Sequence, residues 1–403
     1  MTESLTKSTT VDTPMPRAAL GENVAPKLGY FQHALPINLI LFTFALVTIP
    51  LALLTVFRPS ALLMWTYVWL FGMTHLVVTF TVYLQSRNLR YFTSSTKNVL
   101  IYMAIPIVVF LGFDLLHAFR IGALFPTFAL LFWGAIRLLD LNHFNRQTFG
   151  VFQLFKARAG VSTAPWMKRC ENGYFHSLTV MIFATFLNGG TSPFLRAGTW
   201  SGFGEMAGSP AEPVLPLGAL QIIAGIAAVC ALGFFIASMV GFRTASQNAG
   251  NKDGLIHALL YFAFQSASAL MAVVSFPLYL AALAMHYVEY HVLMVPRCLN
   301  SPLDETSRLD RFYGRMRSNR FAFYSIVLAV AFLVTCLSMA GMGMMGRAPE
   351  SLMQPFDYLV LIAVFDGLFV FHYFIEMFIW RFRDPHFRIA LAGMYIAPAT
   401  KMK

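Results

Sequence analysis

Charged residues are scarce in this chain. Only 12% of its 403 residues are Asp, Glu, Lys or Arg, whereas 58% are hydrophobic and the mean hydropathy is +0.64. Soluble globular domains contain about 25% charged and about 45–50% apolar residues. This composition excludes a soluble enzyme, a disordered chain and a nucleic-acid-binding module. It predicts an all-α fold, a polytopic bundle of membrane helices.

Cysteine is equally sparse, and the motifs of several enzyme classes are missing. The four cysteines are scattered without a CxxC pair, which excludes a zinc knuckle and a disulfide framework. We find no glycine-rich phosphate-binding motif in a suitable context and no GxSxG sequence. The first residues lack a basic segment followed by an apolar stretch and a cleavage site, so we expect no cleaved signal peptide.

The chain does contain long apolar runs. A helix needs about 20 apolar residues to cross the hydrocarbon core of a bilayer. This length predicts a flexible cytoplasmic tail over 1–35, a membrane domain over 36–380 and a cytoplasmic tail over 381–403. Ten spans are expected within the membrane domain, at 36–56, 60–84, 98–119, 121–139, 173–188, 215–241, 254–273, 276–296, 321–345 and 356–380.

The basic residues divide unequally between the two sides of this predicted bundle. With the N-terminus in the cytoplasm, 24 of the 29 Lys and Arg residues fall in cytoplasmic segments and four fall in outer segments, while Arg137 lies within a span. Cytoplasmic loops of membrane proteins carry an excess of Lys and Arg. The bias predicts that both termini are cytoplasmic, and it explains the net charge of +11 without a nucleic-acid partner.

Two cytoplasmic segments mix aromatic and basic residues. They cover 145–156, NRQTFGVFQLFK, and 303–320, which contains LDRFYGRMRSNR. Helices that lie in the membrane interface have this composition. Both segments are therefore predicted to be interfacial.

Histidines gather on one side of the predicted bundle. Ionisable groups inside membrane spans are costly and indicate functional sites. Eight of the ten histidines fall at, or just inside, the cytoplasmic face, although the assignment of sides used only Lys and Arg. They are His75, His143, His176, His257, His286, His291, His372 and His386.

Helical spacing places carboxylates beside several of these histidines. His286 and Glu289 are three residues apart, and His372 and Glu376 are four apart, so each pair shares a helix face. Imidazole and carboxylate together form a donor set for iron, manganese or zinc, and helix bundles build metal sites in this way. The predicted metal ligands are His75, His143, His176, His257, His286, His372, Glu289 and Glu376. Glu289, Glu376 and Asp366 are also the candidate catalytic carboxylates, and Asp140, Tyr287, Tyr290 and Tyr373 are candidates to orient the ligands.

This layout resembles that of the histidine-rich integral-membrane non-haem iron enzymes, the membrane desaturases, hydroxylases and alkane monooxygenases. Their HxxxH and HxxHH boxes are missing here, and the shortest histidine spacing is His286 to His291. The dispersed single histidines are more similar to the pattern of the bacterial membrane carotene-cleaving dioxygenases. Both resemblances imply an iron held by histidines, which lie at the cytoplasmic membrane face in the first group and are dispersed over several helices in the second, and neither assigns a role to a particular residue.

Three functions follow as hypotheses. The first is a metal-dependent oxidoreductase of the bacterial inner membrane that acts on a lipid or isoprenoid substrate, uses non-haem iron (with zinc or manganese as alternatives) and receives electrons from a partner protein. The second is a proton-coupled transporter or channel in which Asp366, Glu289, Glu376 and the histidines form a relay. The third is a haem- or quinone-linked electron-transfer subunit.

Overall fold

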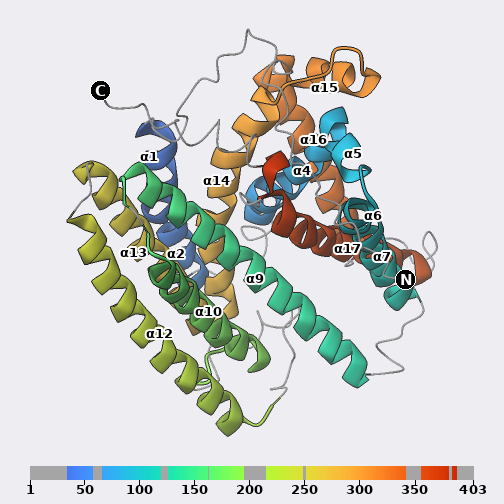
Figure 1. Cartoon of the computed structure of the whole chain (residues 1–403). Helices are drawn as coiled ribbons and strands as arrows, with labels where there is room; N and C mark the ends of the chain where they lie inside the picture. Colours follow the sequence, from blue (N-terminus) through green and yellow to red (C-terminus); the bar gives the residue numbers. More distant parts are fainter. Residues whose placement is uncertain are drawn as a thin grey trace, which may run out of the picture.

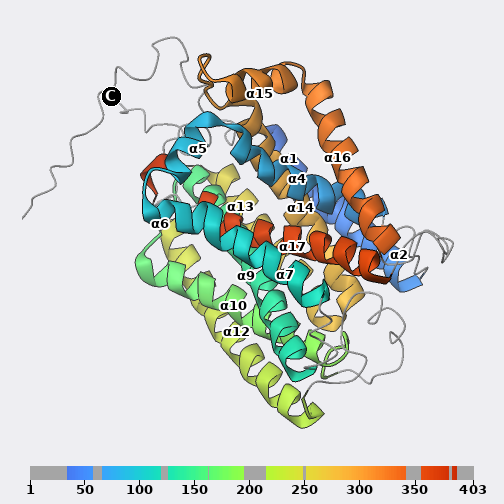
Figure 2. The same ribbon diagram turned by 90° about the vertical axis from the view of Figure 1, so that its right-hand side faces the viewer.

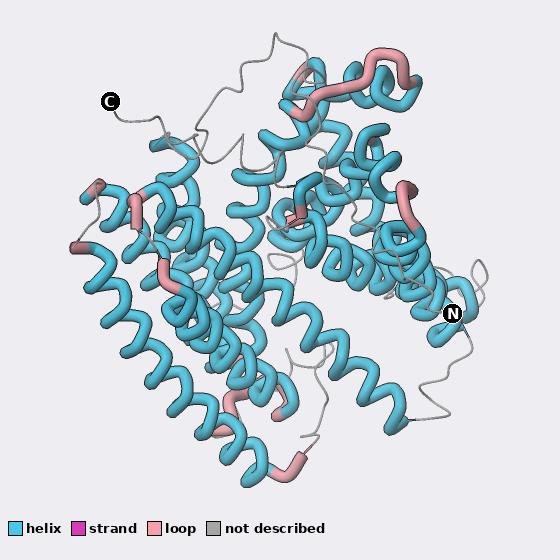
Figure 3. The backbone as a smooth tube through the Cα atoms, in the orientation of Figure 1, coloured by secondary structure: helices cyan, strands magenta, loops and turns pink. Residues whose placement is uncertain are grey.

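The structure, a computed structural model, describes residues 34–57, 66–118, 126–161, 163–194, 215–247, 251–341, 355–380 and 384–387. Within these ranges the chain is helical, and the only β-type pairing is an isolated bridge between Thr191 and Ser275 (Figure 3). The predicted all-α fold class is therefore confirmed for the described part of the chain.

The N-terminal third of the chain forms short helices with frequent interruptions. Three π-helical turns, η3, η4 and η6, continue into α-helices, and η4 directly precedes the helix that carries His75. Such turns insert an extra residue and occur often at functional sites. The elements are α1 (Ala34–Thr43), η3 (Phe44–Thr48), α2 (Ile49–Phe57), η4 (Val68–Met73), α4 (Thr74–Phe80), η5 (Thr81–Leu84), α5 (Ser86–Phe92), α6 (Thr96–Val99), η6 (Leu100–Ala104) and α7 (Ile105–Ala118).

The remainder of the chain consists mostly of long helices. The predicted break between the seventh and eighth spans is confirmed: Ser275 has an extended backbone, and its hydroxyl accepts a hydrogen bond from the backbone N–H of Leu278. The elements are α9 (Pro126–Arg158), α10 (Pro165–Leu187), α12 (Leu217–Ser246), α13 (Lys252–Val274), α14 (Phe276–Asn300), α15 (Arg308–Ser318), α16 (Arg320–Gly341) and α17 (Pro355–Ile379).

Helix α14 lies at the centre of the bundle. Figure 1 shows it between the group of α9, α10, α12 and α13 on one side and the group of α4 to α7 with α15 to α17 on the other. It packs against α13, α1, α2 and α4, while α10 packs along α12, and α17 along α7 (Figure 2). Gly72 of η4 allows the close approach of α14, since a Cβ atom there would lie 3.2 Å from the ring of Tyr287.

Four described helical segments are long and apolar enough to cross a membrane, and the number rises to six if two sharply bent helix pairs each count as one span. The four are Leu35–Phe57, Leu217–Ser246, Lys252–Val274 and Pro277–Asn300. These helices are compatible with an integral membrane protein. The count of ten spans and the cytoplasmic position of both termini stay predictions from the sequence.

The two segments predicted to be interfacial have different surroundings. Residues 145–156 continue α9 without a break, and Phe152 and Phe155 on this segment are buried. Residues 303–320 contain α15, which meets α16 at an angle of 103°. The buried carboxylate of Asp310 on α15 accepts hydrogen bonds from the N–H and the hydroxyl of Ser86, which dock this helix on α5. Their position at a membrane surface stays a prediction.

A buried ion pair joins the end of α9 to the start of α10. The ammonium of Lys156 donates to both carboxylate oxygens of Glu171 at 2.5 and 2.6 Å, and Gln153 donates to the same carboxylate at 2.9 Å. Both charged side chains are about 1% exposed. Removing one partner of a buried pair leaves an uncompensated charge, which costs about 3–5 kcal/mol.

We therefore expect Lys156→Met to lower the thermal unfolding midpoint of the purified protein strongly. The double variant Lys156→Met/Glu171→Leu removes both charges and is expected to recover most of the loss. Lys168→Met, the same change at an exposed position of α10, is the control. An unfolding midpoint for Lys156→Met equal to that of Lys168→Met would contradict this expectation.

Candidate metal centre

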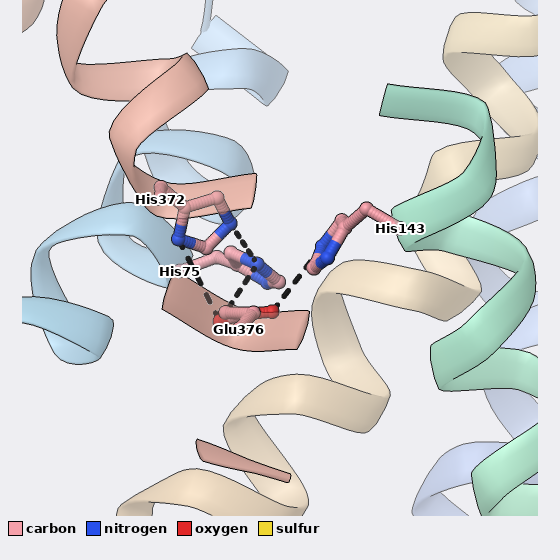
Figure 4. A group of neighbouring side chains, drawn as sticks. All are labelled: His75, His143, His372 and Glu376. Carbon is pink, nitrogen blue, oxygen red and sulfur yellow. Dashed lines mark hydrogen bonds and ion pairs between the residues drawn. The ribbon is translucent and has the colours of Figure 1, made fainter. Parts of the chain in front are cut away.

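Four buried side chains from three helices converge in the interior of the bundle. His75 lies on α4, His143 lies on α9, and His372 and Glu376 lie on α17 (Figure 4). One donor atom from each residue lies within 4.8 Å of a donor atom from every other. The four residues are between 1% and 4% exposed. This group, His75, His143, His372 and Glu376, is the candidate metal centre.

The distances within the group are close to those that a shared ion requires. Nε2 of His75 lies 2.8 Å from Nε2 of His372. Nε2 of His143 lies 3.2 Å from Oε2 of Glu376, and Nδ1 of His372 lies 3.6 Å from Oε1 of the same residue. Nitrogen and oxygen ligands bind a metal at about 2.0–2.2 Å, so neighbouring donors lie about 3–3.5 Å apart. The four side chains are therefore close enough to share one ion.

Three of the donor atoms are buried without a hydrogen bond. Among the described residues, no group forms a hydrogen bond with Nε2 of His143, Nδ1 of His372 or Oε2 of Glu376. A buried polar atom left unpaired costs about 1–3 kcal/mol, and such atoms are rare in folded proteins. A cation that accepts their lone pairs would remove this cost, so the donor set fits a metal ion.

The two oxygens of Glu376 have different surroundings. Oε1 accepts a hydrogen bond of 2.7 Å from the hydroxyl of Thr79, which lies 2.6 Å from the hydroxyl of Tyr290. Oε2 faces His143 and is left for a metal. Thr79 follows His75 by one turn of the same helical segment and therefore points to the same side. The carboxylate is thus held in place by a partner on the helix that supplies another ligand.

We expect Thr79→Val to weaken metal binding by about 10–100-fold, because loss of the partner that orients a ligand typically has this effect. Valine keeps the shape of threonine and removes only the hydroxyl. Titration of the apoprotein with Fe²⁺ measures the change. Thr74→Val is the control, since the hydroxyl of Thr74 contacts His291 at 2.9 Å instead of a member of the metal centre. Equal affinities in the two variants would refute this role of Thr79.

His286 lies beside the metal centre without belonging to the converging set. It is buried on α14, and its ring centroid lies 4.8 Å from that of His75 and 5.0 Å from that of His143. Its Nδ1 is another buried nitrogen that forms no hydrogen bond with any described residue. His286 is therefore a neighbour of the site, and its assignment as a ligand stays a prediction.

Glu289 is not among the converging side chains of the metal centre. It is fully buried one turn after His286, and its Oε1 accepts a hydrogen bond from the amide of Gln265 on α13. That amide also lies 3.2 Å from the hydroxyl of Tyr261. The carboxyl of Glu289 is thus engaged by polar groups of α13, and the structure does not bring it together with Glu376.

The two remaining predicted histidine ligands lie outside the metal centre. His176 is exposed on α10, and Nδ1 of His257 on α13 lies 2.9 Å from the guanidinium of Arg158. The side chain of Asp366 lies outside the described residues. The structure therefore groups three of the six predicted histidine ligands with one of the two predicted glutamates.

A second polar cluster borders the metal centre on α9. The hydroxyl of Tyr279 donates to Oδ2 of Asp140 at 3.0 Å, and the guanidinium of Arg137 lies 3.5 Å from the same oxygen. A small cavity adjoins these three residues. The ring of Tyr373 lies beside the metal centre, since its centroid is 5.3 Å from that of His143. Asp140 and Tyr373 were predicted from the sequence as neighbours of the ligands, whereas Thr79 and Tyr279 were not.

No protein-family model, curated protein or solved structure matches this chain. Its function is therefore inferred from the geometry and chemistry of the metal centre.

Proposed function

We propose that this chain is a membrane-embedded, metal-dependent oxidoreductase with one non-haem iron held by His75, His143, His372 and Glu376. The observation that carries the proposal is the convergence of four fully buried donors, three of which offer an atom without a hydrogen bond. When bound, the iron would supply one-electron chemistry and activate O₂. The protein would hold the ion, orient its ligands and exclude bulk water.

The donor chemistry supports iron among the possible metals. Three imidazoles and one carboxylate, without a thiolate, suit iron, zinc or manganese. Four protein ligands would leave coordination positions open for O₂ and substrate. Zinc in structural sites prefers four closed tetrahedral positions and has no redox chemistry, so iron or manganese suits an oxidoreductase better.

The surroundings of the site support an apolar substrate. Described helices that pack around the metal centre expose large apolar side chains at their outer surface, such as Leu46 on η3 and Val108 on α7. In a bilayer this surface contacts lipid, so a lipid or isoprenoid could enter between helices without crossing water. An oxygenase of this class also needs electrons, and we propose a separate electron-donor protein as partner.

The distribution of basic residues supports an orientation. With ten spans and both termini in the cytoplasm, the His143 segment of α9 lies toward the cytoplasmic side, since Arg146, Lys156 and Arg158 follow it. The electron donor would then approach from the cytoplasm. The bacterial inner membrane is the proposed location.

Cysteine labelling with a membrane-impermeant reagent tests this orientation in a variant without native cysteines. We expect Ser318→Cys, at the exposed end of α15, to react only from the cytoplasmic side. Phe194→Cys, 53% exposed after α10, is expected to react only from the opposite side. The reverse pattern, or labelling of both positions from one side, would exclude the proposed topology.

A proton-coupled transporter is the second candidate, and one observation favours it. His75 and His372 share a hydrogen bond, and Glu376, Thr79 and Tyr290 continue a chain of buried polar groups. Such a chain could carry protons without a metal.

Elemental analysis and an absorption spectrum of the purified protein separate these functions. The oxidoreductase proposal expects about one iron per chain and no Soret band. Protein that stays metal-free after incubation with Fe²⁺ favours the proton relay. A Soret band indicates haem and favours the electron-transfer subunit.

A further inference from the structure

Tyr290 occupies a special position between the metal centre and the outer part of the bundle. Its side chain is fully buried on α14, and its ring centroid lies 3.9 Å from that of His75. Its hydroxyl lies 2.6 Å from that of Thr79. The phenol therefore touches one member of the metal centre directly and connects to another through one hydroxyl.

That hydroxyl provides a path for the phenolic proton. Thr79 donates to Oε1 of Glu376 at 2.7 Å, and Oε1 is the oxygen not needed by the metal. A phenol loses its electron readily only when its proton can leave at the same time. The chain from Tyr290 through Thr79 to Glu376 supplies that proton acceptor inside an apolar interior.

A second aromatic ring extends the contact outward. The ring centroid of Trp380, directly after α17, lies 5.9 Å from that of Tyr290 in an edge-to-face arrangement. Trp380 is half-buried, and the guanidinium of Arg297 lies 5.9 Å from its ring. Trp380, Tyr290 and His75 thus form a continuous series of packed rings from a partly exposed position to the metal centre.

We propose that Tyr290 and Trp380 carry single electrons between a donor protein and the metal centre. This inference rests on the proposed function, because it requires a redox-active iron. The proposed function requires such a route, because the four residues of the metal centre are buried and a donor protein would not contact them directly.

The transfer balances in two steps. With a redox-active iron bound, Tyr290 would supply one electron to the oxidised metal centre, its phenolic proton would pass to Thr79, and the proton of Thr79 would pass to Oε1 of Glu376. A one-electron carrier protein of the iron–sulfur class then returns an electron through Trp380, and the protons move back. The carrier loses one electron, the iron gains one, and no proton is consumed.

Tyr287 provides a matched control on the same helix. Its ring centroid also lies near that of His75, at 5.6 Å, and it too is buried. It packs toward Tyr67, at 5.8 Å, rather than toward Trp380. Tyr287→Phe therefore removes a comparable buried phenolic hydroxyl near His75, from a ring that packs on Tyr67.

The test uses full-length protein loaded anaerobically with Fe²⁺, mixed with O₂ and frozen within milliseconds for EPR spectroscopy. We expect an organic-radical signal that narrows when the tyrosines are ring-deuterated. The signal per bound iron is expected to persist in Tyr287→Phe and to disappear in Tyr290→Phe. In Trp380→Phe the radical should form and then decay at least an order of magnitude more slowly on addition of dithionite.

The outcomes separate this inference from the proposed function. Iron that binds to every variant, with the same radical yield in Tyr290→Phe as in the wild type, overturns the role of Tyr290. The absence of a radical signal from the iron-loaded wild type also overturns the role of Tyr290. Decay in Trp380→Phe at the wild-type rate overturns the outer step. A wild-type protein that binds no iron overturns both the proposed function and this electron route.

Discussion

Glu376→Gln is expected to empty the metal centre and to abolish metal-dependent activity. Glutamine keeps the shape of the side chain and removes the only carboxylate of the converging set. A neutral amide is a much poorer ligand for a hard or borderline cation, and the charge of the ion would then be left without compensation in an apolar interior. Metal content by elemental analysis, and Fe²⁺ affinity by titration, measure the loss.

Two further variants make this expectation specific. Glu289→Gln changes an equally buried carboxyl that faces Gln265, so it should keep stoichiometric metal. Glu376→Asp should fail like Glu376→Gln, because the shorter side chain withdraws the carboxylate from the ion. A proton relay expects the reverse, with partial function in Glu376→Asp. Full metal content in Glu376→Gln would exclude this residue as a ligand.

His143→Ala is expected to abolish the thermal stabilisation that added Fe²⁺ gives to the apoprotein. The ligands lie on α4, α9 and α17, so a bound ion links three helices that are far apart in the sequence. A ligand that binds only the folded state stabilises it by about 2.7 kcal/mol when its concentration is 100 times its dissociation constant. Addition of Fe²⁺ to the wild-type apoprotein should therefore raise the thermal unfolding midpoint markedly.

The same addition should leave the midpoint of His143→Ala nearly unchanged, because the remaining donors bind the ion weakly. His176→Ala is the matched control, since this histidine is exposed on α10 and should retain the full response to metal. An Fe²⁺-induced stabilisation of His143→Ala as large as that of the wild type would contradict the assignment of His143.

Part of the metal centre could be predicted from the sequence because helical periodicity fixes which residues share a face. The pair His372 and Glu376 is the clearest case, since four residues separate two donors on one apolar helix. Thr79 had the same signal, four residues after His75, yet threonine is common in membrane helices and bonds there to its own backbone. Its role becomes visible only when Glu376 is placed beside it.

The remaining predictions depended on helix neighbours, which periodicity does not specify. His176 and His257 lie on helices that contact one another, α10 and α13, away from the three converging histidines. His286 and Glu289 share a face of α14, but this central helix has partners on several sides. The imidazole therefore lies among the histidines, while the longer carboxyl side chain reaches Gln265.

The ends of helices could likewise be predicted only in part from the sequence. The break between the spans 254–273 and 276–296 was predicted correctly, and the structure shows that Ser275 caps α14 ahead of Pro277. The aromatic and basic pattern of 145–156 suits an interfacial helix, but it also suits the end of a long helix that buries its aromatic face, as α9 does with Phe152 and Phe155. Only the packed neighbours distinguish these two arrangements.

Anomalous X-ray diffraction at the iron absorption edge, from crystals of the Fe²⁺-loaded protein, tests the central claim most directly because it locates the ion. We expect one strong peak about 2.0–2.2 Å from a nitrogen of His75, His143 and His372 and from an oxygen of Glu376. A peak at another group of residues, or fully loaded crystals without a peak among these four side chains, would contradict the proposed metal centre.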